Sequence, residues 1–378
     1  MLNSRSSKRV KRFDPLRKRN VLHIVTAISW RGGEQQVAYL LEELKDDIRQ
    51  TVLCMKGSAM QQYCEKNGID VFPFPKRIKL DFSFAAQIKK LCVKLEIDVC
   101  HLHDAHAHTM AVLAAMIYRN KTDLVLSRRV DFPIKKSYFS KLKYNHPSIK
   151  KILCVSKTIE KIIRPDIVEK DKLTTVYSGI NIDKFKHRSY KLRKELKISD
   201  SIVLIGNTSA LADHKDYFTF IDVAEKLVQQ SEVLKFVVIG DGPLKDEIKS
   251  YLKNKKISDH IYFTGFRKDL PEILADLDLF LITSKTEGLG TSILDAFACG
   301  VPVVGTAAGG MPELIEHEIT GLLCPVKDVE CLTQSVGRLI DSKELSKMLV
   351  QNAKEKVKLF SKAATAKQTL AIYQSIWS

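Results

Sequence analysis

The feature that most constrains the fold is a strand–loop–helix–strand unit in the last third of the chain. Apolar residues predict buried strands at Leu277–Thr283 and Val301–Gly305. Between them, a loop containing Gly288 and Gly290 leads into a helix expected over Ser292–Cys299. Such a unit belongs to a parallel α/β sheet. The loop's backbone N–H groups and the positive end of the helix would meet at one point, which favours an anion site.

Two carboxylates frame this point. Glu287 stands in the loop, and Asp295 lies about one turn into the helix, whose side chains lean toward its N-terminus. An ionised carboxylate only accepts hydrogen bonds, and sugar hydroxyls donate them. A phosphate site beside such acceptors indicates a nucleotide sugar. The residues alone also allow an ordinary βαβ turn in which both acids are solvated or cap the helix.

This stretch resembles the Glu-x7-Glu region of the family 4 (group 1) glycosyltransferases, with Asp295 in place of the second Glu. The resemblance extends over roughly residues 20 to 378, because further short motifs of that family occur in the same order. They are Gly32-Gly-Xaa-Glu34, Gly240-Asp-Gly-Pro243, Gly265-Phe-Arg267, Gly309-Gly-Met-Pro-Glu313 and Thr320-Gly-Leu-Leu323. The resemblance implies the α/β GT-B fold, in which two Rossmann-like, doubly wound domains face a cleft and a C-terminal helix returns to the first domain.

The order of elements along the chain agrees with this expectation. Short strand-like segments alternate with helical patterns in both halves, which is typical of doubly wound parallel sheets. We expect a basic disordered tail at 1–19 and an acceptor-side domain at 20–186, completed by a helix within 360–378. A polar linker near 184–199 would lead into a nucleotide-sugar-binding domain at 187–359.

The composition of the chain indicates which kinds of partner it binds and where in the cell it acts. The chain of 378 residues carries a formal charge of +17, and residues 1–20 hold eight Lys or Arg against one Asp. Such a surface attracts anionic lipid and nucleic acid alike, but no nucleic-acid-binding motif is present, so we expect contact with an anionic membrane. No run of 18 apolar residues and no apolar signal segment occur. The eight cysteines lack C-x-x-C spacing, which predicts reduced thiols without zinc or disulfides in a cytoplasmic protein. Together with the basic surface, this predicts a peripheral location on the inner face of the membrane.

A second glycine loop follows the first expected strand, Val21–Val25, and precedes a helix. In a parallel α/β sheet this loop lies at the carboxyl edge, where ligands bind. The resemblance places Gly32 and Gly33 against the donor and Glu34 on the acceptor side. On local grounds, the two glycines are equally explained by a tight turn.

Four histidines cluster around the strand expected at 98–102. His101 and His103 fall on one face by alternation, and the strand's carboxyl end points into the cleft. We expect His103 to take part in catalysis and His106 to bind acceptor hydroxyls, with structural or solvated roles as the alternative. No zinc-type spacing is present, so we expect no metal and no cofactor.

The segment after the next strand is unusually cationic. Many relatives carry a His near Arg129, where this chain has two arginines and Asp131. We expect Arg129 to act in catalysis and Arg128 and Asp131 to lie on the acceptor side; a salt bridge within the loop is the alternative. The next residues suit a membrane interface or a solvated basic helix, because lysines alternate with aromatics: Lys135, Lys136, Tyr138, Phe139, Lys141, Lys143 and Tyr144.

In the second half, Lys215 matches the family's lysine that meets the donor diphosphate. The family's arginine position holds Ala210, and its glycine position holds Asp216. Half of the expected cationic clamp is therefore missing. We expect His214 or an arginine of the 128–129 loop to replace it.

The resemblance implies a retaining, metal-independent hexosyltransferase. It would move a sugar from a nucleotide-sugar donor to a saccharide or lipid-linked acceptor in cell-surface polysaccharide or lipopolysaccharide synthesis. Lys215, Glu287, Arg129 and His103 would serve catalysis. The donor would be held by Gly32, Gly33, Gly265, Phe266, Arg267, Gly288, Leu289, Gly290, Thr291 and Asp295. Alternatives are a nucleotide-sugar epimerase of the same fold and a non-catalytic sugar-nucleotide-binding relative.

Overall fold

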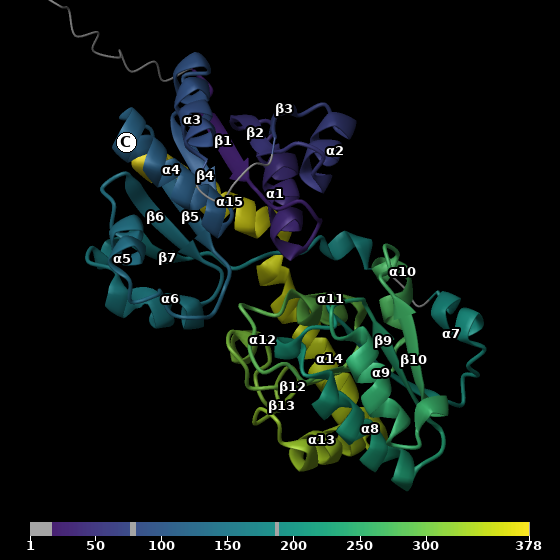
Figure 1. Ribbon diagram of the computed structural model, residues 1–378. Helices are drawn as coiled ribbons and strands as arrows, with labels where there is room; N and C mark the ends of the chain where they lie inside the picture. The colour runs from purple at the N-terminus through teal and green to yellow at the C-terminus, as the bar shows by residue number, and fades with distance from the viewer. Residues whose placement is uncertain (1–16, 76–80, 186–188, 378) are drawn as a thin grey trace, which may run out of the picture.

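The computed structural model describes residues 17–75, 81–185 and 189–377, and these residues form two parallel sheets (Figure 1). The first sheet has the strand order β3-β2-β1-β4-β5-β6-β7. Its strands are β1 (Asn20–Val25), β2 (Arg49–Met55), β3 (Asp70–Phe74), β4 (Val99–Leu102), β5 (Asp123–Arg128), β6 (Ile149–Cys154) and β7 (Leu173–Thr175). The accompanying helices are α1 (Gly32–Glu43), α2 (Ala59–Lys66), α3 (Phe82–Lys94), α4 (Ala105–Tyr118), α5 (Tyr138–Tyr144) and α6 (Lys157–Ile163).

The second sheet has the order β10-β9-β8-β11-β12-β13. Its strands are β8 (Val203–Thr208), β9 (Leu234–Ile239), β10 (Ile261–Gly265), β11 (Leu279–Ile282), β12 (Val303–Thr306) and β13 (Leu322–Cys324). The helices of this half are α7 (Lys191–Leu196), α8 (Tyr217–Gln230), α9 (Lys245–Lys253), α10 (Leu270–Ile273), α11 (Thr291–Cys299), α12 (Met311–Leu314), α13 (Val329–Asp341), α14 (Lys343–Val357) and α15 (Lys362–Trp377). The predicted pair of doubly wound α/β domains is confirmed.

Continuous apolar strands and capped helices explain these elements. Every residue of β4 and of β11 is buried, as expected for parallel strands covered on both faces. α4 begins after Asp104, because the Asp104 side chain accepts hydrogen bonds from the first-turn amides of His106 and Ala107 (3.0 and 2.8 Å).

Both sheets reverse their strand order beside their first strand. β1 pairs with both β2 and β4, and β8 pairs with both β9 and β11. Loops that leave the carboxyl ends of strands at such a switch point diverge and leave a crevice where ligands bind. The crevice of the first domain lies between the loops after β1 and β4, and that of the second lies between the loops after β8 and β11.

The C-terminal helix α15 returns to the first domain, as predicted. It packs against α1, behind the first sheet in the view of Figure 1. Its Tyr373 hydroxyl lies 2.5 Å from Nδ1 of His101, and Lys362 forms ion pairs with Glu42 and Glu43 (2.6 and 2.8 Å). The second domain is therefore held to the first by two crossings of the chain.

Three sequence predictions need correction or qualification. Residues 1–16 of the expected tail and 186–188 of the expected linker lie outside the described residues. The end of the tail is held, because Arg17 and Arg19 form ion pairs with Asp98 (3.7 and 3.4 Å). The linker is also shorter than expected, since α7 lies within it and the buried Arg193 donates to the backbone carbonyl of Asp276 (3.1 Å).

The expectation that no disulfide forms was wrong. Cys324 ends β13 and Cys331 lies in the first turn of α13, and the two are disulfide-bonded with a Cα–Cα distance of 5.8 Å. The turn between strand and helix brings them together although seven positions separate them, a spacing that no short cysteine motif reveals. The other six cysteines are free.

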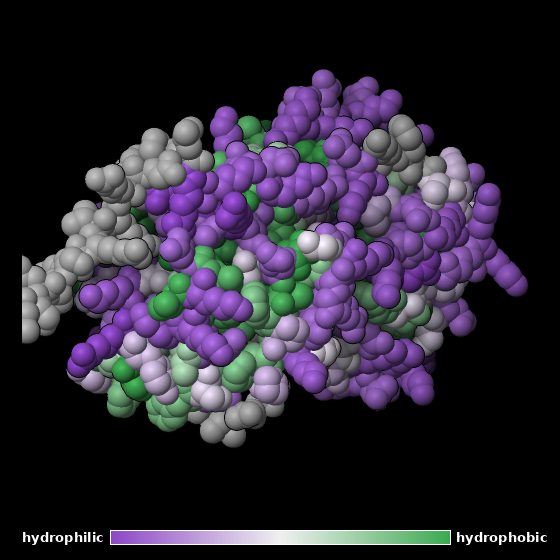
Figure 2. All heavy atoms as spheres, turned by 90° about the horizontal axis from the view of Figure 1, so that it is seen from above, coloured by the Kyte–Doolittle hydropathy of each residue, from purple (hydrophilic) through white to green (hydrophobic). Residues whose placement is uncertain are grey.

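The surface seen from above is mostly hydrophilic, with apolar side chains gathered in a limited area (Figure 2). Within the described ranges, no helix combines the length and the apolar character needed to cross a membrane.

Candidate active site

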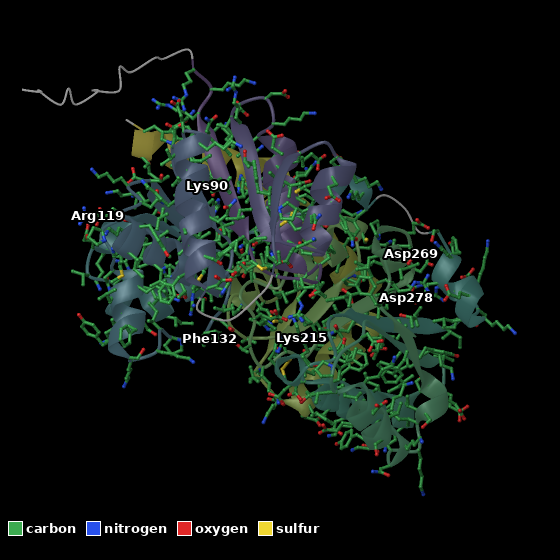
Figure 3. The ribbon with its side chains drawn as sticks, turned by 45° about the horizontal axis from the view of Figure 1, so that its top comes forward. Lys90, Arg119, Phe132, Lys215, Asp269 and Asp278 are labelled. Atoms are coloured by element: carbon green, nitrogen blue, oxygen red, sulfur yellow. A yellow bond between two sulfur atoms is a disulfide. The ribbon has the colours of Figure 1, made fainter. Side chains whose placement is uncertain are left out.

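Lys215 and Glu287 meet at the switch point of the second domain. Lys215 ends the short turn after β8, and Glu287 lies in the loop after β11. The Lys215 Nζ donates to Glu287 Oε1 at 2.5 Å, and the Ser284 hydroxyl donates to the same oxygen at 2.8 Å. The two side chains are 16% and 10% exposed, so this is a largely buried ion pair. Figure 3 shows Lys215 where the two domains face each other.

Glycines allow the chain to fold tightly around Glu287. Gly309 has a φ of +53°, and a Cβ there would overlap the Glu287 carbonyl. The Gly310 N–H donates to that carbonyl at 2.9 Å. The Gly309-Gly310 motif therefore fixes the backbone that presents the Glu287 carboxylate.

The N-terminus of α11 lies beside this pair. Gly290 precedes the helix with a φ of +90°, a conformation that favours glycine. Leu289 is buried, and Thr291 begins the helix. The loop and first turn thus carry the helix N-terminus predicted to bind an anion.

Asp295 lies on α11, half-buried and facing the first domain. Burial raises the pKa of its carboxyl group from 3.8 to about 7. Its charge contributes to raising the pKa of Tyr39 on α1 to about 12, after the larger effect of burial. Figure 1 shows α1 and α11 on the sides of the two domains that face each other. Among the described residues, no hydrogen bond or ion pair engages the Asp295 carboxylate.

Arg129 lies where the first domain meets the Glu287 loop. A Cβ at Gly288 would overlap the Arg129 carbonyl, so only glycine allows these two backbones to approach. The Arg129 Nη1 donates to the His103 carbonyl at 3.1 Å, and its Nε is buried without a partner. Burial lowers the pKa of Arg129 to about 10, with the nearby carboxylates of Glu34 and Asp104 acting in the opposite direction. Arg129 is therefore a charged, largely enclosed cation that, among described residues, has no ion pair.

His103 belongs to a buried histidine cluster that also contains His23 and His101. His23 Nε2 lies 3.1 Å from Gln50 Oε1, and His23 Nδ1 lies 2.9 Å from His103 Nε2. His101 contacts the hydroxyls of Ser127 and Tyr373 at 2.8 and 2.5 Å. Burial lowers the pKa of all three rings, that of His23 to about 4, so the cluster is neutral at pH 7.

The cluster's hydrogen bonds define its tautomers. Gln50 donates its amide N–H to the Leu41 carbonyl, so its oxygen faces His23 and must accept from Nε2–H. His23 Nδ1 then accepts from His103 Nε2–H, which leaves His103 Nδ1 as a buried acceptor without a partner. The three side chains are close enough to hold a metal, but every ring nitrogen except this one already has a hydrogen-bond partner.

Several expected site residues are engaged elsewhere. Arg128 is buried and donates to the hydroxyl of Tyr144 (2.7 Å) and to the carbonyl of Phe132. The acceptor role predicted for Arg128 stays a prediction. The structure also contradicts the alternative salt bridge with Asp131, one of whose oxygens is buried without a partner. Arg267 is held by Asp269 (2.8 and 2.7 Å) and Glu195 (2.6 Å).

The remaining predicted residues lie at or near the two crevices. Glu34 accepts the Arg31 N–H at 2.9 Å, and burial raises its pKa. His106 is half-buried beside the Phe84 ring at 6.0 Å. Gly32 and Gly33 begin α1. Phe266 is 66% exposed next to Gly265, whose φ is +70°. Their roles stay predictions.

Glu313, which carried no predicted role, joins the two domains. Its carboxylate accepts hydrogen bonds from the N–H groups of Lys157 and Thr158 (2.9 and 2.8 Å) at the start of α6. It also accepts from the hydroxyls of Thr158 (2.8 Å) and Tyr177 (2.9 Å). A carboxylate at a helix N-terminus is stabilised there, so Glu313 fixes how the second domain meets the first. The Gly309-Gly-Met-Pro-Glu313 motif was visible in the sequence, but its partner lies in the other domain.

Two Rossmann-like domains that face a cleft define the GT-B class of fold, and solved structures agree. Anabaena HepE in complex with UDP and glucose superposes with a TM-score of 0.82 at 20% identity, over 94% of this chain and 100% of that one. The sequence model of Glycosyltransferase Family 4 matches residues 30–184, and that of Glycosyl transferases group 1 matches residues 189–356. The chain belongs to the family 4 (group 1) glycosyltransferases.

Two relatives show the range within this family. N-acetyl-alpha-D-glucosaminyl L-malate synthase of Bacillus anthracis is 29% identical over 301 residues, 77% of either chain. The N-acetylgalactosamine-N,N'-diacetylbacillosaminyl-diphospho-undecaprenol 4-alpha-N-acetylgalactosaminyltransferase of Campylobacter jejuni is 25% identical over 356 residues, 90% of this chain and 95% of that one. The acceptors named for these two relatives differ in kind, so membership of the family does not identify the acceptor of this chain.

Proposed function

We propose that this protein is a retaining, metal-independent hexosyltransferase that transfers a sugar from a nucleotide-sugar donor to a saccharide or lipid-linked acceptor in cell-surface polysaccharide or lipopolysaccharide synthesis. The observation that carries the proposal is the buried Lys215–Glu287 pair beside the N-terminus of α11. It combines a cation and backbone amides for a diphosphate with a carboxylate for sugar hydroxyls. UDP and glucose in HepE and the diphospho-undecaprenol named in the Campylobacter relative support the two substrate classes.

The proposed transfer needs positioning and charge stabilisation more than covalent chemistry. The bond between the sugar's anomeric carbon and the diphosphate breaks, and the acceptor hydroxyl bonds to that carbon on the same face. The hydroxyl proton passes to the departing phosphate oxygen. Lys215 and the amides of residues 288–291 would stabilise the charge on the diphosphate, which removes the need for a metal. Neutral His103, whose backbone carbonyl accepts a hydrogen bond from Arg129 at 3.1 Å, would position that cation.

Product stereochemistry tests this mechanism. A retaining enzyme gives a product whose anomeric configuration equals that of the donor, which proton NMR reads from the anomeric coupling constant. Activity in excess chelator should equal that in buffer alone. An inverted product, or activity lost to the chelator and restored by a divalent cation, would contradict the proposal.

We predict that Asp295 makes nucleotide binding depend on pH. If its carboxylate accepts hydrogen bonds from the ribose hydroxyls, the ionised form binds best. With a pKa of about 7, the Kd for UDP should fall about tenfold between pH 6 and pH 8. Calorimetric titration of Asp295→Asn with UDP gives the control. Any pH dependence of the Kd that remains in this variant comes from ionisation of the nucleotide's own phosphate. An equal pH dependence in both proteins would remove Asp295 from the nucleotide site.

The Asp295 carboxyl group should also make the stability of the fold depend on pH, with a rise in pH lowering stability while it strengthens nucleotide binding. Its pKa is raised in the folded state, so the folded protein binds the extra proton between about pH 3.8 and 7. The free energy of unfolding should therefore fall as pH rises through this window, and Asp295→Asn should flatten the dependence.

We predict that Arg129→Ala lowers turnover about tenfold or more on every acceptor, including uncharged ones. A buried cation without an ion pair costs free energy of folding unless an anion binds beside it. Ala210 occupies the position of the family's diphosphate-binding arginine, so we expect Arg129 to supply the missing positive charge. Two contacts support this role: the Arg129 backbone carbonyl lies against Gly288, and its side-chain Cδ lies 3.9 Å from where a Cβ of Gly33 would stand. Steady-state kinetics with charged and neutral acceptors give the measurement. A raised KM for anionic acceptors only, with UDP affinity and donor hydrolysis unchanged, would assign Arg129 to the acceptor instead.

A further inference from the structure

An exposed set of aromatic and lysine side chains lies on one side of the first domain. We call it the aromatic–lysine face and define it as Phe132, Lys135, Lys136, Tyr138, Phe139 and Lys141. Phe132, Tyr138 and Phe139 are 56%, 74% and 80% exposed, and the rings of the last two stack edge to face at 5.9 Å. Exposed aromatic rings so close together mark an interaction surface.

The protein holds these rings in place from beneath. Arg128 donates to the Phe132 carbonyl, and its guanidinium lies 4.9 Å from the centre of the Phe132 ring. Ile134 is buried, as is Tyr144 at the other end of α5. The exposed rings therefore stand on an anchored loop and helix, and docking them costs little conformational entropy.

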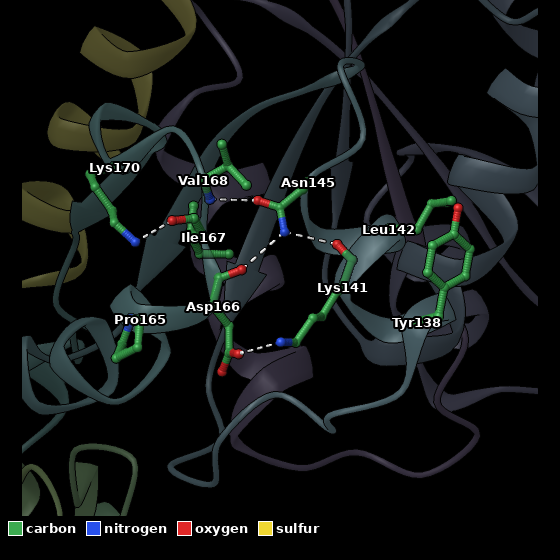
Figure 4. A pocket seen from close by; sticks show the side chains of 9 residues that line it. All are labelled: Tyr138, Lys141, Leu142, Asn145, Pro165, Asp166, Ile167, Val168 and Lys170. Carbon is green, nitrogen blue, oxygen red and sulfur yellow. Dashed lines mark hydrogen bonds and ion pairs between the residues drawn. The ribbon is translucent and has the colours of Figure 1, made fainter.

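A hollow of about 560 Å³ continues the face (Figure 4). Tyr138, Lys141 and Leu142 form one wall, and Val168 and Lys170 belong to the other. Asn145 joins the walls, because its amide donates to the carbonyls of Lys141 (2.9 Å) and Asp166 (3.0 Å) and accepts the Val168 N–H (2.7 Å). Lys141 and the exposed Val168 thus border a fixed cavity with mixed polar and apolar walls.

The charge of the face selects its partner. The face carries Lys135, Lys136 and Lys141; Lys141 pairs with Asp166 of the hollow (3.8 Å), whereas Lys135 and Lys136 have no ion pair among the described residues. Aromatic rings flanked by lysines match the boundary of an anionic bilayer, where rings enter the headgroup layer and lysines meet phosphates. Phe132 lies at the edge of the first domain on the side of the second (Figure 3), and its segment begins at Arg129, against Gly288.

We propose that the aromatic–lysine face docks this protein on an anionic phospholipid membrane, with the hollow receiving a lipid headgroup. Docking here would hold the mouth of the cleft at the membrane surface, within reach of a lipid-linked acceptor. That consequence rests on the proposed function, whereas the docking itself does not.

Vesicle flotation of the full chain tests the proposal, with phosphatidylglycerol–phosphatidylcholine vesicles against phosphatidylcholine alone. Tyr138→Ser/Phe139→Ser and Lys135→Glu/Lys136→Glu should each lower binding to anionic vesicles about tenfold or more. Matched controls are Val93→Ser/Ile117→Ser, which removes exposed apolar side chains of α3 and α4, and Lys343→Glu/Lys347→Glu on α14. The controls should bind within about twofold of the parent, since charge far from the surface contributes little.

Salt separates the face from the basic residues 1–16. At high salt the electrostatic part of binding is screened, so the remaining binding should depend on Tyr138 and Phe139 and not on deletion of residues 1–16. Binding to anionic vesicles that is unchanged in both face variants, or lost equally in the matched controls, would overturn the proposal. The proposal would also be overturned if the same face variants equally abolished a protein–protein complex formed without lipid. Transfer to a soluble acceptor should stay normal in the face variants, and its absence in the parent would instead count against the proposed function.

Discussion

Lys215→Ala should lower kcat about 100- to 1,000-fold, the cost of removing one preorganised charge from a transition state that develops charge on the leaving group. Lys215 is the cation that the structure places closest to Glu287, at 2.5 Å, and its side chain is mostly enclosed. Steady-state turnover with saturating donor gives the measurement. Lys226→Ala is a matched control, because its ion pair with Glu330 is exposed and contributes at most about 1 kcal/mol.

Stability must be separated from catalysis in this variant. Removing Lys215 leaves the Glu287 carboxylate largely buried without its cation, which destabilises a fold by up to about 3–5 kcal/mol. The double variant Lys215→Ala/Glu287→Gln removes the buried charge as well. Its melting temperature should recover toward that of the parent while its turnover stays low. Near-normal turnover in Lys215→Ala would show that another cation holds the diphosphate.

Glu287→Gln should lower kcat about 100-fold while the Kd for UDP changes by no more than about threefold. Glutamine keeps the size and one oxygen for Ser284, so the loop held by Gly309 and Gly310 should survive. What it loses is the charge that strengthens hydrogen bonds from sugar hydroxyls as positive charge develops on the sugar ring.

The comparison of two quantities tests the assignment of Glu287 to the sugar. Calorimetry with UDP reports nucleotide binding, and turnover reports the chemical step. An equal loss in both would move Glu287 to the nucleotide or to a structural role. Ser335→Ala, at a buried hydroxyl beside the disulfide sulfur of Cys324, serves as a control for loss of a buried polar contact away from the cleft.

Much of the fold could be predicted because local signals agreed with the final arrangement. The helix at 105–118 begins where Asp104 caps it, and the expected strands lie close to the observed ones. No strand was predicted at β13, whose residues overlap the Thr320-Gly-Leu-Leu323 motif. The helix N-terminus beside Gly290 could be predicted from the spacing of Gly288, Gly290 and the helix, whatever the surroundings.

The parts of the site that depend on pairing between distant elements could not be predicted. His23 lies opposite His101 only because β1 pairs with β4 in that register. Arg128 and Arg129 are adjacent in sequence, but side chains alternate across a strand, so one enters the core beside Tyr144 and the other lies beside the glycine loop of α1. Glu313 meets α6 across the domain boundary. Each requires the tertiary structure to be known.

The most direct test of the central claim is transfer itself. The full chain is incubated with a panel of UDP-, GDP- and ADP-sugars, with and without lipid-diphosphate and free saccharide acceptors, and the products are read by mass spectrometry. The account predicts one donor whose sugar appears on an acceptor as an added hexose mass, with stoichiometric release of the nucleoside diphosphate, and loss of this product in Lys215→Ala. A donor that is bound but only epimerised without acceptor, or never consumed, would contradict it.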